Sequence, residues 1–302
     1  MTGISPDRSI LATSLRLLGA MGLMFLALVA GSLVMGDAGQ SFTPEEEALS
    51  SRVAVVIAVI NALVLSYLAL RSRWHGWKLV GALFLVQFGL ETLMTQIETL
   101  AFRQAMGLTP EQIAPLFLGG FLRALIFAPL AVVILGKTQR VALFARDNTR
   151  LRFSLGGWVK RLTYLAVAYV MVYFLFGYFI AWQSPELRQF YAESTDLKPF
   201  LSHMMHIIGD EPGLLLLQFV RGYLWVIIVL PIIRMHKGGT LETGLAISVT
   251  MAVLVSGSLL FPNPYMPEPV RMIHFTELWT SMAVFGVLTA WIMMFRPGRP
   301  SL

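Results

Sequence analysis

Hydrophobic residues in this chain gather in eight runs, each close to 20 residues long, which polar segments separate. A helix needs roughly 20 apolar residues to cross a hydrocarbon layer about 30 Å thick. The runs therefore predict an all-α fold, a polytopic transmembrane helix bundle that forms a single transmembrane domain over residues 1–302. The predicted spans are residues 11–35, 53–70, 78–102, 116–136, 162–183, 213–234, 243–261 and 274–295.

Composition agrees with a membrane protein. Of the 302 residues, 56% are hydrophobic and 13% are charged, whereas roughly 25% of an average soluble domain is charged. The chain has no cysteine, which excludes disulfides and thiolate chemistry and leaves a metal to His, Asp and Glu. The formal net charge is +6, but the basic residues cluster in short loops between the spans. The predicted partner is therefore the lipid bilayer and no nucleic acid.

Basic residues are distributed unequally between the two sides of the membrane. When the loops are assigned alternately, the side with both termini holds 16 of the 23 Lys and Arg, and the other side holds five. Because basic loops stay in the cytoplasm, both termini are predicted to be cytoplasmic. Residues 137–161 then form a basic cytoplasmic loop, residues 184–212 a long outer loop, and residues 261–270, with four prolines, a rigid outer turn.

Carboxylates interrupt the third apolar run, in the stretch "FGLETLMTQIETLAFR" at residues 88–103. At about 100° per residue, Gln87, Glu91, Thr95 and Glu98 fall within a stripe about 80° wide on one face of a helix. Exposure to lipid would be costly for each carboxylate. The stripe is therefore predicted to face other helices or an outward-opening cavity.

Other polar residues map to the same outer half of the membrane. Arg123 and Arg221 lie about 12 and 13 Å along their predicted helices, and Gln218 shares a helix face with Arg221. The predicted outward-facing site comprises Glu91, Glu98, Arg123, Gln218, Arg221, His274 and Glu277. The alternative is a set of structural pairs that lock the helices together, for example Glu91 or Glu98 with Arg123, and Glu277 with Arg221.

Two histidine motifs could bind a metal. His274 and Glu277, together with Glu98, would form a set of two carboxylates and one histidine that suits Zn or Fe. A hydrogen-bonded His-Glu pair is the alternative. His203 and His206 lie one helical turn apart and could supply two further ligands, but a solvated surface helix is the favoured explanation, because this spacing is common and no third ligand is fixed.

Several segments resemble one family of bacterial polytopic membrane proteins. They are "MTQIETLAF", "FGYFIAWQSPELRQFY", "FVRGYLW", "LPIIRM" and "PNPYMPEPVRMIHFTE", and they extend over residues 94 to about 286. The resemblance implies a multi-pass protein of the bacterial inner membrane with about eight helices. It assigns no chemistry to any residue.

An enzyme that acts on a lipid or a membrane-embedded substrate fits the outward-facing site. In that hypothesis Glu98, Glu277 and His274 bind a metal or serve as general acid and base, and Arg123 and Arg221 hold a phosphate or carboxylate.

Two other functions fit the same sequence. In an ion-coupled transporter or permease, Glu91 would be the coupling carboxylate and the arginines the anion site. In a non-catalytic subunit or assembly factor, residues 184–212 and 261–270 would dock a membrane-protein partner.

Overall fold

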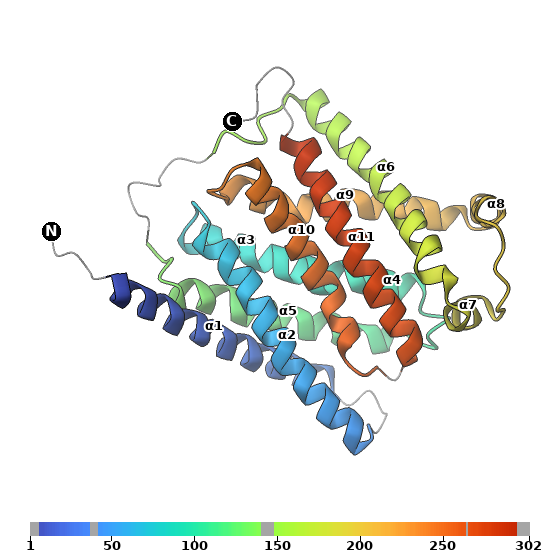
Figure 1. Ribbon diagram of the computed structural model, residues 1–302, viewed down its shortest axis with the longest axis horizontal. Helices are drawn as coiled ribbons and strands as arrows, with labels where there is room; N and C mark the ends of the chain where they lie inside the picture. The colour runs from blue at the N-terminus through green and yellow to red at the C-terminus, as the bar shows by residue number, and fades with distance from the viewer. Residues whose placement is uncertain (1–5, 37–41, 140–147, 264, 295–302) are drawn as a thin grey trace. The chain divides into compact units, whose positions relative to one another are not determined.

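The computed structural model describes residues 6–36, 42–139, 148–263 and 265–294 (Figure 1). Within these ranges, eight helices are long and apolar enough to cross a membrane, and no β-strand occurs beyond an isolated bridge between Ser72 and His236. This confirms the predicted all-α fold with eight candidate spans. The location of the termini stays a prediction.

The chain divides into two compact units. Unit 1 comprises residues 1–147 and 235–237, and unit 2 comprises residues 148–234 and 238–302. The elements of unit 1 are α1 (Pro6–Met35), α2 (Pro44–Leu70), α3 (Gly76–Phe88), the π-helix η1 (Gly89–Leu93), α4 (Met94–Ala101) and α5 (Pro110–Ile134). In this unit α1 packs on α5 and α2, and α3 packs on α5.

A pair of small residues lets α1 and α5 approach closely. A Cβ atom added at Gly31 would lie 2.8 Å from the carbonyl oxygen of Gly119. Small residues at such crossings are typical of membrane helices, which pack through close backbone contact.

Unit 2 contains α6 (Leu155–Phe179), the 3₁₀ helix η3 (Ala181–Gln183), α7 (Pro185–Ala192), α8 (Phe200–Asp210), α9 (Pro212–Met235), α10 (Thr240–Ser256), the 3₁₀ helix η4 (Gly257–Leu260) and α11 (Glu268–Met294). Figure 1 shows α10 and α11, in orange and red, side by side. A Cβ atom at Gly286 of α11 would lie 2.6 Å from the Cα atom of Ser248 in α10. The backbones of these two helices are therefore in direct contact.

Three helices begin with Ser or Thr followed by Pro-Glu, and two of these helices start earlier than the apolar runs predicted. Before α2, the Thr43 amide donates to Glu46 Oε2 at 2.9 Å and the Glu46 amide donates to Thr43 Oγ1 at 3.3 Å. This reciprocal capping box makes a polar first turn helical. Thr109 and Ser184 hold the equivalent positions before α5 and α7. Hydropathy misses such turns because their Glu and Gln residues lower the average hydropathy of the first turn.

The predicted span 78–102 corresponds to the candidate span Gly76–Ala101, but this span is not a regular α-helix throughout, because the π-helix η1 interrupts its middle. The extra residue per turn of a π-helix breaks the predicted polar stripe, so that Gln87 and Glu91 are buried while Thr95 and Glu98 are half-buried. The predicted long loop 184–212 contains α7 and α8. The predicted loop 137–161 falls partly outside the described residues, and α6 begins at Leu155.

Candidate functional site

Unit 1 places a carboxylate on its π-helix, inside the span Gly76–Ala101. Single π-turns are rare and frequently mark functional positions, because they change where side chains project. The hydroxyl of Thr95 donates to the carbonyl oxygens of Glu91 at 2.9 Å and Thr92 at 3.0 Å. These bonds satisfy acceptors in the irregular turn and hold Glu91 in its position.

The Glu91 carboxylate joins three elements of unit 1. Its Oε1 atom accepts a hydrogen bond from Asn61 Nδ2 of α2 at 2.6 Å. Its Oε2 atom lies 3.2 Å from Nε of Arg123 in α5, and the two side chains are 5% and 17% exposed. The structural pair between Glu91 and Arg123 that the sequence suggested is therefore present.

Close backbone approach brings α5 to this carboxylate. A Cβ atom at Gly120 would lie 2.0 Å from Thr92 Oγ1, so a glycine is needed where η1 meets α5. Within the described residues, Asn61 Oδ1, Gln87 Oε1 and Thr92 Oγ1 are buried and make no hydrogen bond. Buried acceptors of this kind are costly and rare in native proteins. We call Asn61, Gln87, Glu91, Thr92 and Arg123 the Glu91 cluster.

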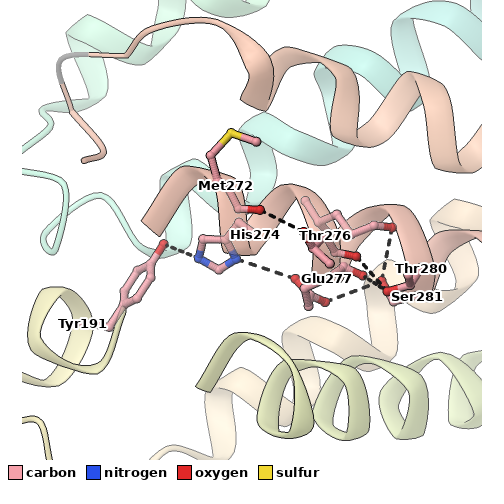
Figure 2. Close-up of polar contacts among 8 residues, drawn as sticks. Tyr191, Met272, His274, Thr276, Glu277, Thr280 and Ser281 are labelled. Atoms are coloured by element: carbon pink, nitrogen blue, oxygen red, sulfur yellow. Dashed lines mark hydrogen bonds and ion pairs between the residues drawn. The ribbon is translucent and has the colours of Figure 1, made fainter. Parts of the chain in front are cut away.

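Unit 2 brings together a tyrosine, a histidine and a glutamate (Figure 2). Tyr191 Oη of α7 lies 3.2 Å from His274 Nε2 of α11, and His274 Nδ1 lies 3.6 Å from Glu277 Oε2. The i, i+3 spacing places the histidine and glutamate on one face of α11. Ser281 Oγ, one turn further, lies 3.5 Å from Glu277 Oε1. We call Tyr191, His274 and Glu277 the relay.

Two members of the relay are half-buried and the third, Glu277, is buried. Tyr191 is half-buried, the His274 side chain is 22% exposed and the Glu277 side chain is 7% exposed. The tyrosine ring stands edge-on to the imidazole, with centroids 5.6 Å apart and planes at 81°.

Two arginines fix the elements that carry the relay. Arg188 of α7 donates to the carbonyl oxygens of Trp182 at 2.6 Å and Thr195 at 2.9 Å, which ties both ends of α7 to its flanking turns. Arg271 donates to the carbonyl oxygens of Leu259 and Phe261 and so anchors the start of α11. These buried guanidiniums have structural roles that their positions in the sequence did not reveal.

Arg221 of α9 occupies an aromatic environment in unit 2. Its Nη1 atom donates to Gln218 Oε1 at 2.8 Å. Its guanidinium carbon lies 5.9 Å from the ring centroid of Tyr169 and 5.7 Å from that of Trp225. Arg221 is 1% exposed, and a desolvated cation-π contact contributes about 2 kcal/mol. Gln218 and Arg221, predicted as binding residues, are thus adjacent and deeply buried.

The histidines of α8 have separate surroundings. His206 Nδ1 pairs with Asp210 on the surface, while the His203 ring packs against Tyr178 and Trp182 at centroid distances of 5.5 and 5.0 Å. Burial, and then the nearby His206, lower the pKa of His203.

Across the described ranges, no group of three or more His, Asp or Glu is placed to hold a metal. The predicted Zn or Fe ligands, Glu98 with His274 and Glu277, and His203 with His206, stay predictions. Glu98 lies half-buried on α4.

Sequence reasoning missed Asn61 and Tyr191. Asn61 is a lone amide inside the apolar run "AVINALVL", and a polar side chain at that depth signals a partner. Tyr191 lies in a segment taken as a loop, so its contact with His274, 83 positions later, had no local signal.

The eight apolar helices define an integral, multi-pass membrane protein. Comparison with protein-family models, with curated proteins and with solved structures finds no match.

Proposed function

We propose that this protein is a multi-pass enzyme of the bacterial inner membrane that acts on a lipid or another membrane-embedded substrate. The observation that carries the proposal is the relay, in which Tyr191 Oη, the His274 imidazole and the Glu277 carboxylate follow one another at 3.2 and 3.6 Å. A half-buried hydroxyl, an imidazole and a buried carboxylate in this order provide the parts of general acid-base catalysis.

Each member of the relay has a distinct role in this proposal. Glu277 orients the imidazole through Nδ1 and stabilises the imidazolium when it forms. His274 exchanges a proton at Nε2, and Tyr191 carries that proton to or from the substrate. The 3.6 Å separation exceeds hydrogen-bond length, and such contacts often shorten when a substrate binds.

The position of the relay along the chain supports a substrate in the membrane. His274 and Glu277 belong to the first turns of the candidate span Glu268–Met294, and Tyr191 belongs to the short helix α7. Arg221 and Gln218 stay the predicted binding residues for a phosphate or carboxylate, and at 1% and 0% exposure they would have to be uncovered to contact a substrate.

Lipid turnover by purified protein tests the proposal. The full chain is reconstituted in vesicles of total bacterial lipid extract, and lipid masses are followed with time by mass spectrometry. We expect a time-dependent mass change with the wild type that falls about 100-fold or more in His274→Gln and in Glu277→Gln, because acid-base catalysis contributes roughly 10²–10⁴-fold. His206→Gln, the same change on the exposed face of α8, should keep the wild-type rate.

Equal turnover in the wild type and in His274→Gln would remove the relay from the reaction. No mass change with the folded wild type would contradict a lipid-directed enzyme.

A second function, ion-coupled transport, is supported by the Glu91 cluster. A buried carboxylate on a π-helix beside three acceptor oxygens is an arrangement that can take up a proton or a small cation. The test is proton flux into vesicles that contain a pH-sensitive dye. Transport predicts a flux that Glu91→Gln abolishes and that Glu45→Gln, at an exposed carboxylate of α2, leaves intact. Absence of a flux that depends on Glu91 would contradict this function.

A further inference from the structure

Three turns of unit 1 are tied together at one end of its helices. The amide of Arg73 donates to the Met235 carbonyl at 2.7 Å, and the amide of Lys237 donates to the Arg71 carbonyl at 2.8 Å. The Gly76 amide donates to the Lys137 carbonyl at 2.8 Å. Gly76 has φ +53°, which L side chains rarely adopt. The turns therefore form one ordered structure rather than three independent loops.

Basic side chains converge on this structure. We call them the basic turn cluster, and they are Arg71, Arg73, His75, Lys137 and Lys237. Lys137 Nζ donates to the Ser72 carbonyl at 2.8 Å and lies 3.3 Å from His75 Nε2. Lys237 Nζ donates to the Leu70 carbonyl at 3.2 Å.

The cations of the cluster act on one another. Burial, with the charge of Lys237 as the second cause, lowers the pKa of Lys137 to about 8. Burial also lowers the pKa of Lys237, and Arg71 and Arg73 lower it further. An anion at this place would offset the repulsion among these cations.

Arg73 supplies the donor geometry that an oxyanion needs. Its Nε atom is buried and makes no hydrogen bond among the described residues, while its backbone is held by Met235. A guanidinium presents paired N–H groups that match two oxygens of a phosphate.

Tryptophans indicate the depth of the cluster in the membrane. Lys78 Nζ lies 4.2 Å from the ring centroid of Trp74, and Trp77, in the first turn of α3, is 83% exposed. Exposed tryptophans at the end of a span sit at the level of the lipid headgroups. Phosphate groups are concentrated at that level.

A general preference for basic cytoplasmic loops does not account for this arrangement. That preference requires only that Lys and Arg stay on one side of the membrane, and solvated side chains meet it. Here Lys137 is 8% exposed, and the turns that carry the cations are hydrogen-bonded to one another. Burying repelling cations costs free energy, which a bound anion would offset.

We propose that the basic turn cluster binds a phosphate group, carried either by an anionic lipid headgroup or by free phosphate. Arg73 and Lys237 make the direct contacts, and the buried Lys137 adds positive charge nearby. The site is independent of the relay and of the enzymatic function proposed for it.

Thermal unfolding of the full chain in a non-ionic detergent tests the site. The probes are dihexanoyl phosphatidylglycerol, dihexanoyl phosphatidylcholine and inorganic phosphate at matched ionic strength, since a ligand that binds the native state raises the unfolding midpoint. We expect the half-effective phosphatidylglycerol concentration to rise about 25-fold in Arg73→Gln/Lys237→Gln, about 5-fold for each charge. The matched control is Arg52→Gln, an exposed basic residue near the opposite end of α2.

The probes distinguish the two sources of phosphate. A shift with phosphatidylglycerol but not with inorganic phosphate identifies a lipid headgroup, and equal shifts identify free phosphate. The proposal is overturned if neither probe shifts the midpoint, if phosphatidylcholine acts as strongly as phosphatidylglycerol, or if the double variant responds like the wild type. Should the double variant not fold, the single variant Arg73→Gln must weaken the response about 5-fold, and a response equal to that of the wild type would overturn the site.

Discussion

Removing the carboxylate of the Glu91 cluster should destabilise unit 1, and removing its partner as well should restore most of the loss. Glu91→Leu takes away the acceptor of the 2.6 Å bond from Asn61 and leaves Arg123, 3.2 Å away, without its counter-ion. Arg123 is 17% exposed, so its charge would remain largely buried. Glu91→Leu/Arg123→Leu removes both charges and keeps comparable volume.

The size of the effect follows from burial. Breaking a fully buried ion pair costs about 3–5 kcal/mol, whereas polar contacts between membrane helices average about 0.6 kcal/mol. Because the Glu91 side chain is 5% exposed and Arg123 is partly accessible, we expect each single substitution to cost about 2 kcal/mol. The double substitution should cost about 1 kcal/mol, which gives a coupling free energy of about 3 kcal/mol.

Reversible unfolding in mixed micelles with increasing dodecyl sulfate measures these free energies. Gln104→Leu, which adds the same side chain at an exposed position of unit 1, should stay within about 0.5 kcal/mol of the wild type. A coupling free energy under about 0.5 kcal/mol would refute the reasoning, because it would mean that the carboxylate and the guanidinium do not stabilise each other in the native protein.

Three further predictions concern packing, topology and pH. Gly286→Ala should lower the free energy of unfolding by about 1–3 kcal/mol through overpacking. At Gly177 an added Cβ meets nothing within 4 Å, so Gly177→Ala should raise the free energy of unfolding by about 0.5–1 kcal/mol. Denaturant titration measures both effects. In this cysteine-free chain, Ser202→Cys should react with an impermeant maleimide in intact cells, and Thr138→Cys only after lysis; the reverse order would contradict cytoplasmic termini. The folded-state pKa of Lys137, about 8, is below its ordinary value of 10.5. Between these two pH values the unfolded chain binds more protons than the folded chain, so the free energy of unfolding should rise with pH across this range. Lys137→Met should flatten the rise in unfolding midpoints measured from pH 7 to 10.5, and an unchanged slope would contradict the shifted pKa.

The spans could be predicted from the sequence because lipid imposes one simple requirement, a long apolar helix. Hydropathy did not predict where α2 and α5 start, because Thr43 and Thr109 are followed by polar first turns. The π-helix was equally invisible, because a window average does not register one extra residue per turn. A π-turn changes the direction in which the side chains that follow it project.

The sequence predicted which residues belong to the candidate sites, but it predicted only some of the contacts between them. His274 and Glu277 are three positions apart, so helix geometry alone placed them together. Glu91 and Arg123 are on different helices, and their pairing depends on Gly120, whose missing side chain lets α5 approach Thr92. Asn61 and Tyr191 join their clusters through contacts 30 and 83 positions apart, for which one sequence contains no periodic signal.

The contrast between the Glu91 cluster and the relay explains why we propose acid-base chemistry for unit 2. The Glu91 carboxylate already has a guanidinium and an amide as partners and is 5% exposed, so a substrate would have to displace a counter-ion to use it. His274 is 22% exposed, and its Nε2 atom meets a half-buried hydroxyl that can face a substrate. A paired, enclosed carboxylate suits packing or ion coupling, whereas a partly open imidazole backed by a buried carboxylate suits proton transfer to a bound molecule. Substitutions at Glu91 should therefore change stability or flux, and substitutions at His274 should change turnover while the protein stays folded.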